Sequence, residues 1–406
     1  MKIRESEVMS GFETKYPEER VLFELYRLRG LTKDQIARSI FAGISYIVPY
    51  LTKMQKKGLI GGKVLNKGRA RIAKLYQITD KGIELLEENG YVRKYENIES
   101  EEPMFGTRKP ISYDEMKQTG VYIPRKVSAY DNNQQSSKDK MMFTLYTNQL
   151  YAGLSEYGFH FYDSREWKLK YDLNRNAMVR GGFKTMNGIE YSVYMLFTPE
   201  EVRIASMSDK MLYRMMHEMT EFPQTGRHVI YVHGDQQDYN KVLKFFKENP
   251  VPCEELLIIP HGANDVGLNI IRLLQDHESY QEQLEEYLGA RLNSEEIEQD
   301  TSNLFADYLT VINGEQYYVV DYIKLNEAKL SMILREYTPD KYDRTRIGVI
   351  IMCWNAMGNE LREFYELYPY IQIVEIDIQS DLKAWAETLQ KRKIYLDWTD
   401  AAMLDT

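Results

Sequence analysis

Basic side chains are concentrated in one stretch of the chain that holds no acid. Between Asp34 and Asp80 the sequence has no Asp or Glu. The basic residues of that interval are Arg38, Lys53, Lys56, Lys57, Lys63, Lys67, Arg69, Arg71 and Lys74. Clustered lysine and arginine bind the phosphates of nucleic acid and release the counterions condensed on them. The stretch therefore predicts phosphate binding, although a solvated basic face would have the same composition.

Two helices are expected ahead of most of these residues. Residues 17–29 space their apolar side chains for one face of a helix, with Val21, Leu22, Leu25 and Leu28 as the stripe. Thr32 is a favourable N-cap for a second, short helix. Gln35, three residues later, completes a capping box, and Gly43 ends the helix.

A third helix and a hairpin carry the basic residues themselves. The helix is expected over 45–57, and Gly58 fits its C-terminal cap. Its predicted apolar face is Ile47, Val48, Leu51 and Met54. An extended segment to Val64, a turn at Asn66-Lys67-Gly68 and a return strand to Thr79 follow. Asp80 is then expected to cap a last helix that ends near Asn89.

Helix, turn, helix and hairpin in this order indicate a winged helix-turn-helix, in which the second helix of the motif enters a major groove. The candidate base-reading residues on that helix are Ser45, Tyr46, Tyr50, Lys53 and Gln55, with Lys56 and Lys57 beside them. The candidate phosphate-binding residues of the hairpin are Lys63, Lys67, Arg69, Arg71 and Lys74. A winged helix that binds another protein would share this topology.

Charge is divided unevenly along the 406 residues, whose net charge is −9. Residues 1–95 hold 19 Lys and Arg against 11 Asp and Glu, a net charge of +8. The remainder holds 33 bases and 50 acids, a net charge of −17, so nucleic acid should meet only the head. The two cysteines, Cys253 and Cys353, exclude a disulfide framework and no spacing indicates zinc. We expect a cytoplasmic chain without cofactor or membrane span.

The predicted fold class is α/β (α+β), with the head followed by a tandem body. We predict a winged helix-turn-helix domain over 1–95, a linker over 96–140 and two mixed α/β units over 141–275 and 276–406. A C-terminal helix and an acidic tail end the second unit. Each unit is expected to run helix, hairpin, helix, strand, helix, strand. The hairpins turn at Asn187-Gly188 and Asn313-Gly314, the strongest short signal for such a turn.

This element order is that of a restriction-endonuclease-like core, which holds a divalent metal on acids of two hairpin strands. The second unit offers Asp307 and Asp321. No lysine stands two residues after either of these acids, and Lys324, three after Asp321, is expected on the opposite face of the strand. The first unit lacks an acid in the matching strand. We therefore predict degenerate cores with no catalytic and no metal-binding residues, and structural roles for the two acids.

Other candidate groups are interpreted as structural. His228 and His233 are expected on opposite faces of one strand, so they are poor co-ligands for a metal. Ser164-Arg165-Glu166 is interpreted as a surface turn or a packing corner. The sequence also lacks a Walker motif and a GxGxxG loop, so nucleotide hydrolysis is not predicted.

Two runs of residues carry a resemblance to a known family. They are KKGLI followed by YQITDKGIELL in the head, and FADYLTVINGEQYYVVDY in the body. The chain resembles the replication–relaxation family of plasmid and mobile-element proteins of Gram-positive bacteria, which join a winged helix to a restriction-endonuclease-like body. Where family members can carry Glu on the second hairpin strand, this chain has Val319. The resemblance implies a DNA-binding initiator or accessory protein for replication or transfer of a plasmid or phage.

These observations predict a non-enzymatic, sequence-specific double-stranded DNA-binding protein. One winged helix covers few bases, so we expect a homodimer or higher oligomer, with replication or transfer proteins as further partners. Three alternatives stay open. The chain could be a transcriptional regulator with a ligand-sensing or partner-sensing body, a metal-dependent nuclease that uses Asp307 and Asp321, or an interaction protein whose head does not bind DNA.

Overall fold

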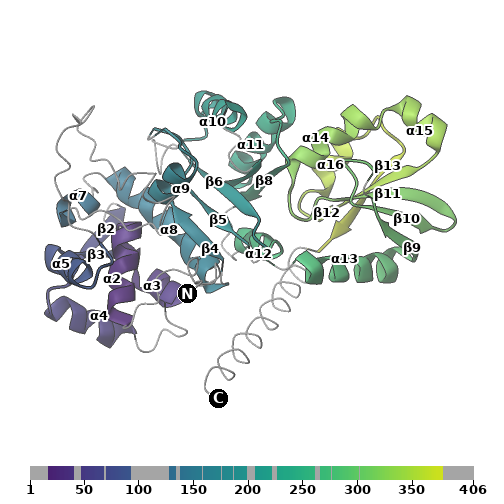
Figure 1. Ribbon diagram of the computed structural model, residues 1–406. Coiled ribbons are helices and arrows are strands. Elements are labelled where there is room, and N and C mark those ends of the chain that lie inside the picture. The colour runs from purple at the N-terminus through teal and green to yellow at the C-terminus, as the bar shows by residue number, and fades with distance from the viewer. Residues whose placement is uncertain are drawn as a thin grey trace, which may run out of the picture. The chain divides into compact units, whose positions relative to one another are not determined.

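The computed structural model is a mixed α/β fold with three β-sheets among its described residues (Figure 1). The structure describes residues 17–40, 47–67, 70–92, 128–133, 138–157, 159–174, 176–185, 187–198, 206–221, 226–260, 266–275, 277–300 and 302–377. The chain divides into two compact units. The first comprises Met1–Gly182 with Glu200–Ile204, and the second comprises Phe183–Pro199 with Ala205–Thr406.

The described part of the first unit begins with four helices and a small antiparallel sheet. The helices are α2 (Pro17–Leu28), α3 (Lys33–Ile40), α4 (Ile47–Lys56) and α5 (Asp80–Glu88). The strands are β1 (Leu31–Thr32), β2 (Ile60–Lys67) and β3 (Ala70–Ile78), in the order β1-β3-β2. The predicted stripe of α2 is confirmed, because Val21, Leu22 and Leu25 are fully buried and Leu28 nearly so.

Local hydrogen bonds set the ends of these elements. Thr32 N donates to Gln35 Oε1 at 2.9 Å, and Gln35 N donates to Thr32 Oγ1 at 3.2 Å, which confirms the capping box. Gly58 follows α4 with a φ of +73°, a left-handed conformation that glycine adopts without strain and that confirms its capping role.

Two boundaries differ from the predictions. Thr79, not Asp80, is the N-cap of α5: its extended backbone lets its side chain accept from Gly82 N at 3.2 Å, and Asp80 is the first helical residue. The first strand of the hairpin, β2, is also longer than predicted. β2 continues through Asn66 and Lys67, with a register shift between Leu65 and Asn66, so two residues of the predicted turn belong to the strand.

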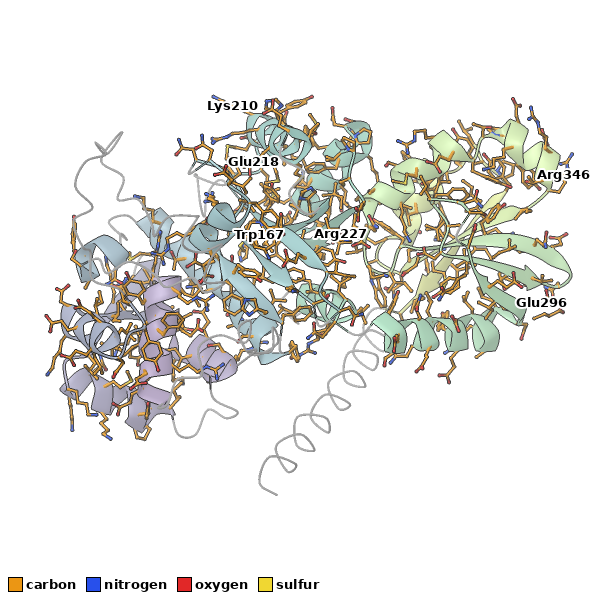
Figure 2. The ribbon with its side chains drawn as sticks, in the orientation of Figure 1. Trp167, Lys210, Glu218, Arg227, Glu296 and Arg346 are labelled. Atoms are coloured by element: carbon orange, nitrogen blue, oxygen red, sulfur yellow. The ribbon has the colours of Figure 1, made fainter. Side chains whose placement is uncertain are left out.

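The rest of the first unit packs against this head. Its elements are α7 (Ala129–Asn133), α8 (Lys138–Glu156), β4 (His160–Asp163) and α9 (Ser164–Lys170). α8 lies along α3. The rings of Tyr151 on α8 and Phe161 on β4 stack at 4.9 Å. Trp167, labelled in Figure 2, is fully buried and closes this part of the core.

The second unit holds a run of three parallel strands joined by helices. Strand β5 (Gly181–Lys184) contains the division between the units and leads into the run. The elements of the run are β6 (Glu190–Phe197), α10 (Asp209–Glu221), β7 (Arg227–His233), α11 (Gln236–Glu248), β8 (Glu255–Pro260) and α12 (Val266–Arg272). β7 pairs in parallel with both β6 and β8, and all three strands are buried along most of their length.

A five-stranded sheet completes the second unit, in the order β13-β12-β11-β10-β9. Its strands are β9 (Ser294–Gln299), β10 (Tyr308–Ile312), β11 (Glu315–Asp321), β12 (Gly348–Trp354) and β13 (Ile371–Ile376). The helices that accompany it are α13 (His277–Leu292), α14 (Glu327–Glu336), α15 (Pro339–Thr345) and α16 (Gly358–Phe364). β10 pairs antiparallel with both β9 and β11, whereas β11, β12 and β13 are mutually parallel.

The predicted order of strands and helices after each Asn-Gly turn is confirmed. Asn313 and Gly314 have φ values of 53° and 80°, as a two-residue hairpin turn requires. From β6 the chain then runs helix, parallel strand, helix, parallel strand. From β11 it follows the same order, except that a second helix, α15, which was not predicted, comes between α14 and β12. Strand β9, whose Glu296 is labelled in Figure 2, was not predicted, because its sequence SEEIEQ lacks apolar alternation.

Several predicted segments fall where the structure gives no description. Residues 96–127 and 134–137 of the predicted linker lie outside the described residues, whereas α7 and the start of α8 fall within its predicted range. The predicted C-terminal helix and acidic tail also lie outside them. The predicted domain boundaries stay predictions. Within the described ranges, none of the helices combines the length and apolar character needed to cross a bilayer.

Candidate functional site

Helix α4 has one buried face and one exposed face. Ile47, Leu51 and Met54 are buried, at the spacing of a single helical stripe. The exposed side chains are Val48, Pro49, Thr52, Lys53 and Lys56, with Lys57 just after the helix. Because the buried stripe is turned into the head, the opposite, partly basic face is the one that a ligand can reach.

One sequence assignment on this helix is wrong. Val48 was predicted to belong to the apolar face, but 53% of its surface is exposed. Positions 47, 51 and 54 already define the buried stripe, and position 48 lies about 100° further round the helix. Sequence reasoning therefore missed three exposed residues, Val48, Pro49 and Thr52, that share the face with the lysines.

The structure describes most, though not all, of the predicted binding residues. Lys53, Lys56, Lys57 and Lys63 are exposed, and Tyr50, Gln55 and Lys74 are half-buried. Burial raises the pKa of the Tyr50 phenol, with the charges of Glu18 and Glu19 as further causes. Ser45, Tyr46 and Arg69 lie outside the described residues, as do the side chains of Lys67 and Arg71, whose backbones belong to β2 and β3.

The hairpin and α4 meet through Lys74. Its Nζ lies 3.4 Å from Gln55 Oε1 on α4 and 4.6 Å from the centre of the Tyr76 ring. Gly62 on β2 makes room for this arrangement, since a Cβ there would lie 2.5 Å from Lys74 Cε. Side chains of the helix and of the hairpin therefore belong to one continuous surface.

An acid of α2 reaches the same surface. Both carboxylate oxygens of Glu18 accept from Lys57 Nζ, at 3.0 and 2.9 Å. Lys53 Nζ lies 3.7 Å from Glu18 Oε1. Glu18 comes before the acid-free interval in the sequence, so counting charges within that interval missed it.

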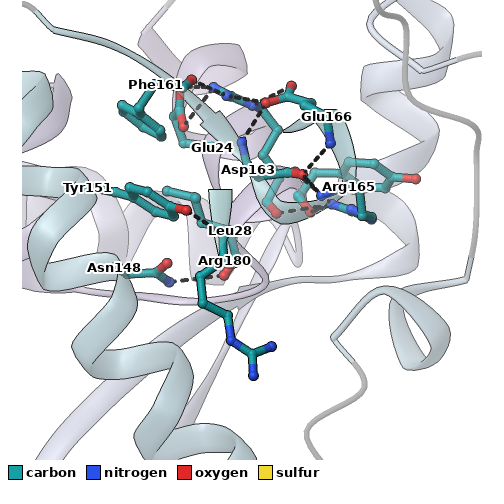
Figure 3. Close-up of polar contacts among 11 residues, drawn as sticks. Glu24, Leu28, Asn148, Tyr151, Phe161, Asp163, Arg165, Glu166 and Arg180 are labelled. Carbon is teal, nitrogen blue, oxygen red and sulfur yellow. Dashed lines mark hydrogen bonds and ion pairs between the residues drawn. The ribbon is translucent and has the colours of Figure 1, made fainter. Parts of the chain in front are cut away.

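A buried ion network holds α2 against β4 and α9 (Figure 3). Arg27, only 9% exposed, donates to Glu166 Oε2 at 2.9 Å and to the Phe161 carbonyl at 3.1 Å, and it pairs with Glu24 at 3.2 Å. Asp163 Oδ1 accepts from the backbone N of Arg165 and Glu166, and Arg165 Nη2 donates to the Arg27 carbonyl at 3.0 Å. The packing-corner interpretation of Ser164–Glu166 is thus confirmed.

Two amides fix the beginning of α3 to α8. Gln35 Nε2 donates to the Leu145 carbonyl at 2.7 Å, in addition to its capping bond. Asn148 Nδ2 donates to the carbonyls of Leu28 and Gly30, at 2.9 and 2.6 Å. The chain between α2 and α3 is therefore held by α8.

A second group of charges lines a small cavity of about 150 Å³ in the second unit. Asp307, Asp321, Lys324 and Tyr280 contribute to its wall. The two aspartates come from the start of β10 and the end of β11, which pair as antiparallel neighbours. The structure thus brings together the two acids that the sequence singled out.

All four carboxylate oxygens of this pair accept hydrogen bonds from the protein. Asp307 Oδ1 accepts from Lys329 Nζ, and Asp307 Oδ2 accepts from Asp321 N at 2.8 Å. Asp321 Oδ1 accepts from the Tyr280 hydroxyl at 2.8 Å and from Ile323 N at 3.1 Å, and its Oδ2 lies 3.2 Å from Lys324 Nζ. The two acids and two lysines therefore neutralise one another.

The pKa values of the two acids move in opposite directions. Burial raises the pKa of Asp307, against the charge of Lys329. Burial also acts to raise the pKa of Asp321. Lys324, Lys329 and the Tyr280 hydroxyl outweigh it and together hold that pKa below the ordinary value. Asp321 is thus the more firmly ionised member, and its charge is shared with the nearby lysines.

The expected position of Lys324 is wrong. The prediction treated residues 321 to 324 as continuous strand, but β11 ends at Asp321. The chain then turns, and Leu325 has a φ of 57°, an uncommon conformation for a bulky residue. This turn returns Lys324 to the side of Asp321. Lys329, which comes from α14, carried no sequence signal that linked it to either acid.

The residues around this cavity do not fit a divalent metal as they are arranged. A metal would need carboxylate oxygens that the lysines, the tyrosine and the backbone already engage. Within the described ranges there is no group of three or more His, Cys, Asp or Glu that could hold an ion. His228 is fully buried and its ring lies 6.0 Å from that of Tyr194, whereas His233 lies 5.5 Å from Phe197.

The first unit thus presents an exposed helix face with several lysines beside a hairpin, and the second encloses a neutralised charge cluster. Comparison of the chain with family models, with curated protein sequences and with solved structures finds no match.

Proposed function

We propose that this chain is a non-enzymatic, sequence-specific double-stranded DNA-binding protein whose head is a winged helix-turn-helix. The observation that carries the proposal is the exposed face of α4, on which Lys53 and Lys56 lie beside a two-stranded hairpin. No acid occurs in the sequence from residue 35 to residue 79, which covers the helix and the hairpin. Phosphates would therefore meet an unopposed positive field over most of this surface.

The order of elements supports this assignment. α2, β1, α3, α4, β2 and β3 follow one another as in a winged helix, with strand order β1-β3-β2. In such a head α3 and α4 form the helix-turn-helix, α4 enters the major groove and the β2–β3 hairpin lies along the adjacent backbone. The support that α8 gives to α3 would keep the helix and the hairpin in fixed register on a duplex.

The residues exposed on α4 suit base reading. Val48, Thr52 and Lys56 follow one another at intervals of four along the helix. An apolar side chain contacts the methyl group of thymine, a threonine hydroxyl can donate or accept, and a lysine donates to guanine acceptors. Ser45, Tyr46, Tyr50 and Gln55 remain candidates from the sequence.

The acidic remainder of the chain would not bind the duplex, because its net charge opposes that of the phosphates. We assign it to homodimerisation or higher assembly, and to recruitment of replication or transfer proteins. This assignment rests on the resemblance to the replication–relaxation family of plasmid and mobile-element proteins. A transcriptional regulator with a ligand-sensing body would use the same head, and the location of the bound DNA separates the two.

The deciding experiment is sequencing of genomic and plasmid fragments retained by the purified protein near physiological salt. Enrichment of one short repeated motif beside an origin or a transfer locus supports the proposal. Enrichment at promoters favours the regulator. Retention of no fragment at any salt concentration contradicts DNA binding and leaves the head as a protein-interaction module.

The hairpin can be tested separately. Replacing Arg69 and Arg71 together by Ala should weaken binding to all duplexes alike. It should also flatten the dependence of log K on log salt, by about 0.9 for each phosphate that the hairpin no longer binds. Unchanged slopes would contradict the assignment of the hairpin as a phosphate-binding wing.

Metal-dependent cleavage is the less favoured function for the cavity of the second unit. The cavity does gather Asp307, Asp321 and Lys324 in one place. However, hydrogen bonds from the protein already engage the carboxylate oxygens. Cleavage of plasmid DNA in Mg²⁺ or Mn²⁺ that is abolished in Asp321→Ala would overturn the non-enzymatic assignment.

A further inference from the structure

Two acids in the first turn of α2 have different surroundings. Glu19 is buried and accepts from neutral donors, the Tyr91 hydroxyl at 2.8 Å and Asn89 Nδ2 at 3.2 Å. Glu18 is 21% exposed and its carboxylate is held by lysine ammonium groups of the α4 surface. Glu19 thus serves the packing of the head, whereas Glu18 places an anion against the surface assigned above to DNA.

The lysines that hold Glu18 are themselves open to solvent. Lys57 is 44% exposed and Lys53 is 64% exposed. They stand four residues apart, so they project from the same side of α4 and its C-terminal turn. Lys57 donates to both oxygens of the carboxylate, at 2.9 and 3.0 Å, and Lys53 approaches one of them at 3.7 Å. The Glu18 carboxylate thus lies between two ammonium groups. Because both lysines are open to solvent, a larger anion can also reach them.

We propose that Lys53 and Lys57 form a seat for one backbone phosphate of duplex DNA, and that the Glu18 carboxylate occupies this seat until DNA displaces it. The proposal rests on the DNA-binding function proposed above and adds to it one phosphate site and a competitor for that site. A carboxylate and a phosphodiester both present anionic oxygens to ammonium donors, so one can replace the other. Glu18 then weakens binding to every duplex to the same extent, whatever its base sequence.

The exchange of Glu18 for a phosphate is feasible because the exposed ion pair is weak. Solvent-exposed pairs of this kind contribute little to stability, because water and salt screen them. Displacing Glu18 therefore costs little, and the displaced acid still repels the incoming phosphate. Removing its charge should raise duplex affinity roughly three- to ten-fold at low salt, because both the competing ion pair and the repulsion disappear.

The salt dependence gives a second, independent readout. In the wild-type chain the displaced Glu18 carboxylate stays near this phosphate and offsets part of the lysine charge, so fewer of the cations condensed on the DNA are released. In Glu18→Gln the same phosphate is neutralised by a lysine that holds no other carboxylate. The slope of log K against log salt should then steepen by up to about 0.9.

The test uses the full-length protein and a fluorescent duplex of random sequence, titrated at several salt concentrations. The variants are Glu18→Gln, Lys57→Gln and the double variant. The control is Glu88→Gln, which removes one negative charge from an exposed position on α5. Thermal unfolding of each variant checks that the fold is retained. We expect a gain for Glu18→Gln, a change below about two-fold for Glu88→Gln, and no gain for Glu18→Gln when Lys57 is already Gln.

The other outcomes each contradict a defined statement. An equal gain in Glu18→Gln and Glu88→Gln would overturn the proposal, because it would reflect net charge alone. A gain that persists in the Lys57→Gln background would overturn the shared seat. If the wild-type protein binds no duplex at low salt, the proposed function itself fails, and that result is distinct from a wild-type protein that binds but does not respond to Glu18→Gln.

Discussion

Lysine occupies two opposed settings in this protein. On α4, Lys53 is 64% exposed and Lys56 also faces solvent. In the cavity of the second unit, Lys324 and Lys329 are only 14% and 20% exposed, and each contacts an aspartate. The side chain is the same, but in the first setting its charge is accessible to a partner and in the second it is neutralised within the protein.

The difference shows that counting the charges in a sequence does not tell which of them a binding partner can reach. An exposed pair exchanges readily with water and ions, so its lysine can be shared with a ligand. A buried pair has given up its hydration, and breaking it leaves one ion without compensation. Substitutions should therefore produce large losses of stability at the buried charges and small ones at the exposed charges.

The largest loss is expected at the buried arginine of the first unit. Arg27→Met should lower the free energy of unfolding by about 4 kcal/mol, because Glu166 and the Phe161 carbonyl lose their buried donor. Denaturant unfolding would measure the change. Arg335→Met is the matched control, since that arginine pairs with Glu336 while 67% exposed. Equal losses in the two variants would contradict the contrast between buried and exposed charge.

The charge cluster of the second unit should respond similarly. Asp321→Ala leaves Lys324 without its carboxylate partner and removes the acceptor of the Tyr280 hydroxyl, so we expect a loss of about 3 kcal/mol. Asp343→Ala, at an aspartate that pairs with Arg346 while 64% exposed, should change stability by less than about 0.5 kcal/mol. An Asp321→Ala protein more stable than the wild type would contradict a stabilising role for this charge cluster.

A buried acid should make the second unit less stable as the pH rises. Burial is the main cause that raises the pKa of Glu327 to about 7, although Tyr322 donates to it. In the unfolded chain this acid ionises near 4.5, so stability falls between about pH 4.5 and 7, by up to about 3 kcal/mol. Glu327→Gln should remove that slope in unfolding experiments across this range. A slope unchanged in the variant would locate its origin elsewhere.

A buried histidine should produce the opposite dependence. Burial lowers the pKa of His228 to about 4, and its two ring nitrogens have no hydrogen-bond partner among the described residues. The unfolded chain protonates near 6.5, so stability is complete above that pH and declines below it, by about 2 kcal/mol at pH 5. His228→Phe should keep its stability between pH 7 and pH 5 better than the wild type. His217, exposed beside Glu221, provides the comparison through His217→Phe.

The smallest change in stability is expected on the exposed face of α4. Lys56→Gln should alter the free energy of unfolding by less than about 0.5 kcal/mol, because the side chain faces solvent. Its effect should appear in DNA binding, as weaker affinity and a salt slope reduced by about 0.9 if it binds a phosphate. A Lys56→Gln protein with normal stability and wild-type affinity would remove this residue from the proposed interface.

Local features of the fold were predictable because their causes lie within a few residues. Thr32 and Gln35 bond across three positions, and Asn313-Gly314 adopts its turn through its own backbone preferences. The parallel strands β7, β8, β12 and β13 could be located from short apolar runs. Strand β9 could not, because its pairing with β10 depends on a neighbour rather than on its own polar sequence.

The sites were only partly predictable. Asp307 and Asp321 were singled out as a pair by their places in the hairpin, and pairing of β10 with β11 brings them together. The sequence placed Lys324 on the wrong face because it did not show where β11 ends. It placed Val48 in the core because a helical period identifies an apolar stripe without fixing its edges.

The sequence by itself determined most of the local elements, the Thr32–Gln35 capping box, the Asn313-Gly314 turn, and the division of charge between a basic head and an acidic remainder. Only the tertiary structure decided which charges are accessible. Arg27 meets Glu166 across 139 positions of sequence, Lys329 meets Asp307 across 22, and Glu18 meets Lys57 across 39. The physical reason is that hydrogen bonds of caps and turns close within a few residues, whereas desolvation and ion pairing depend on which distant segments pack together.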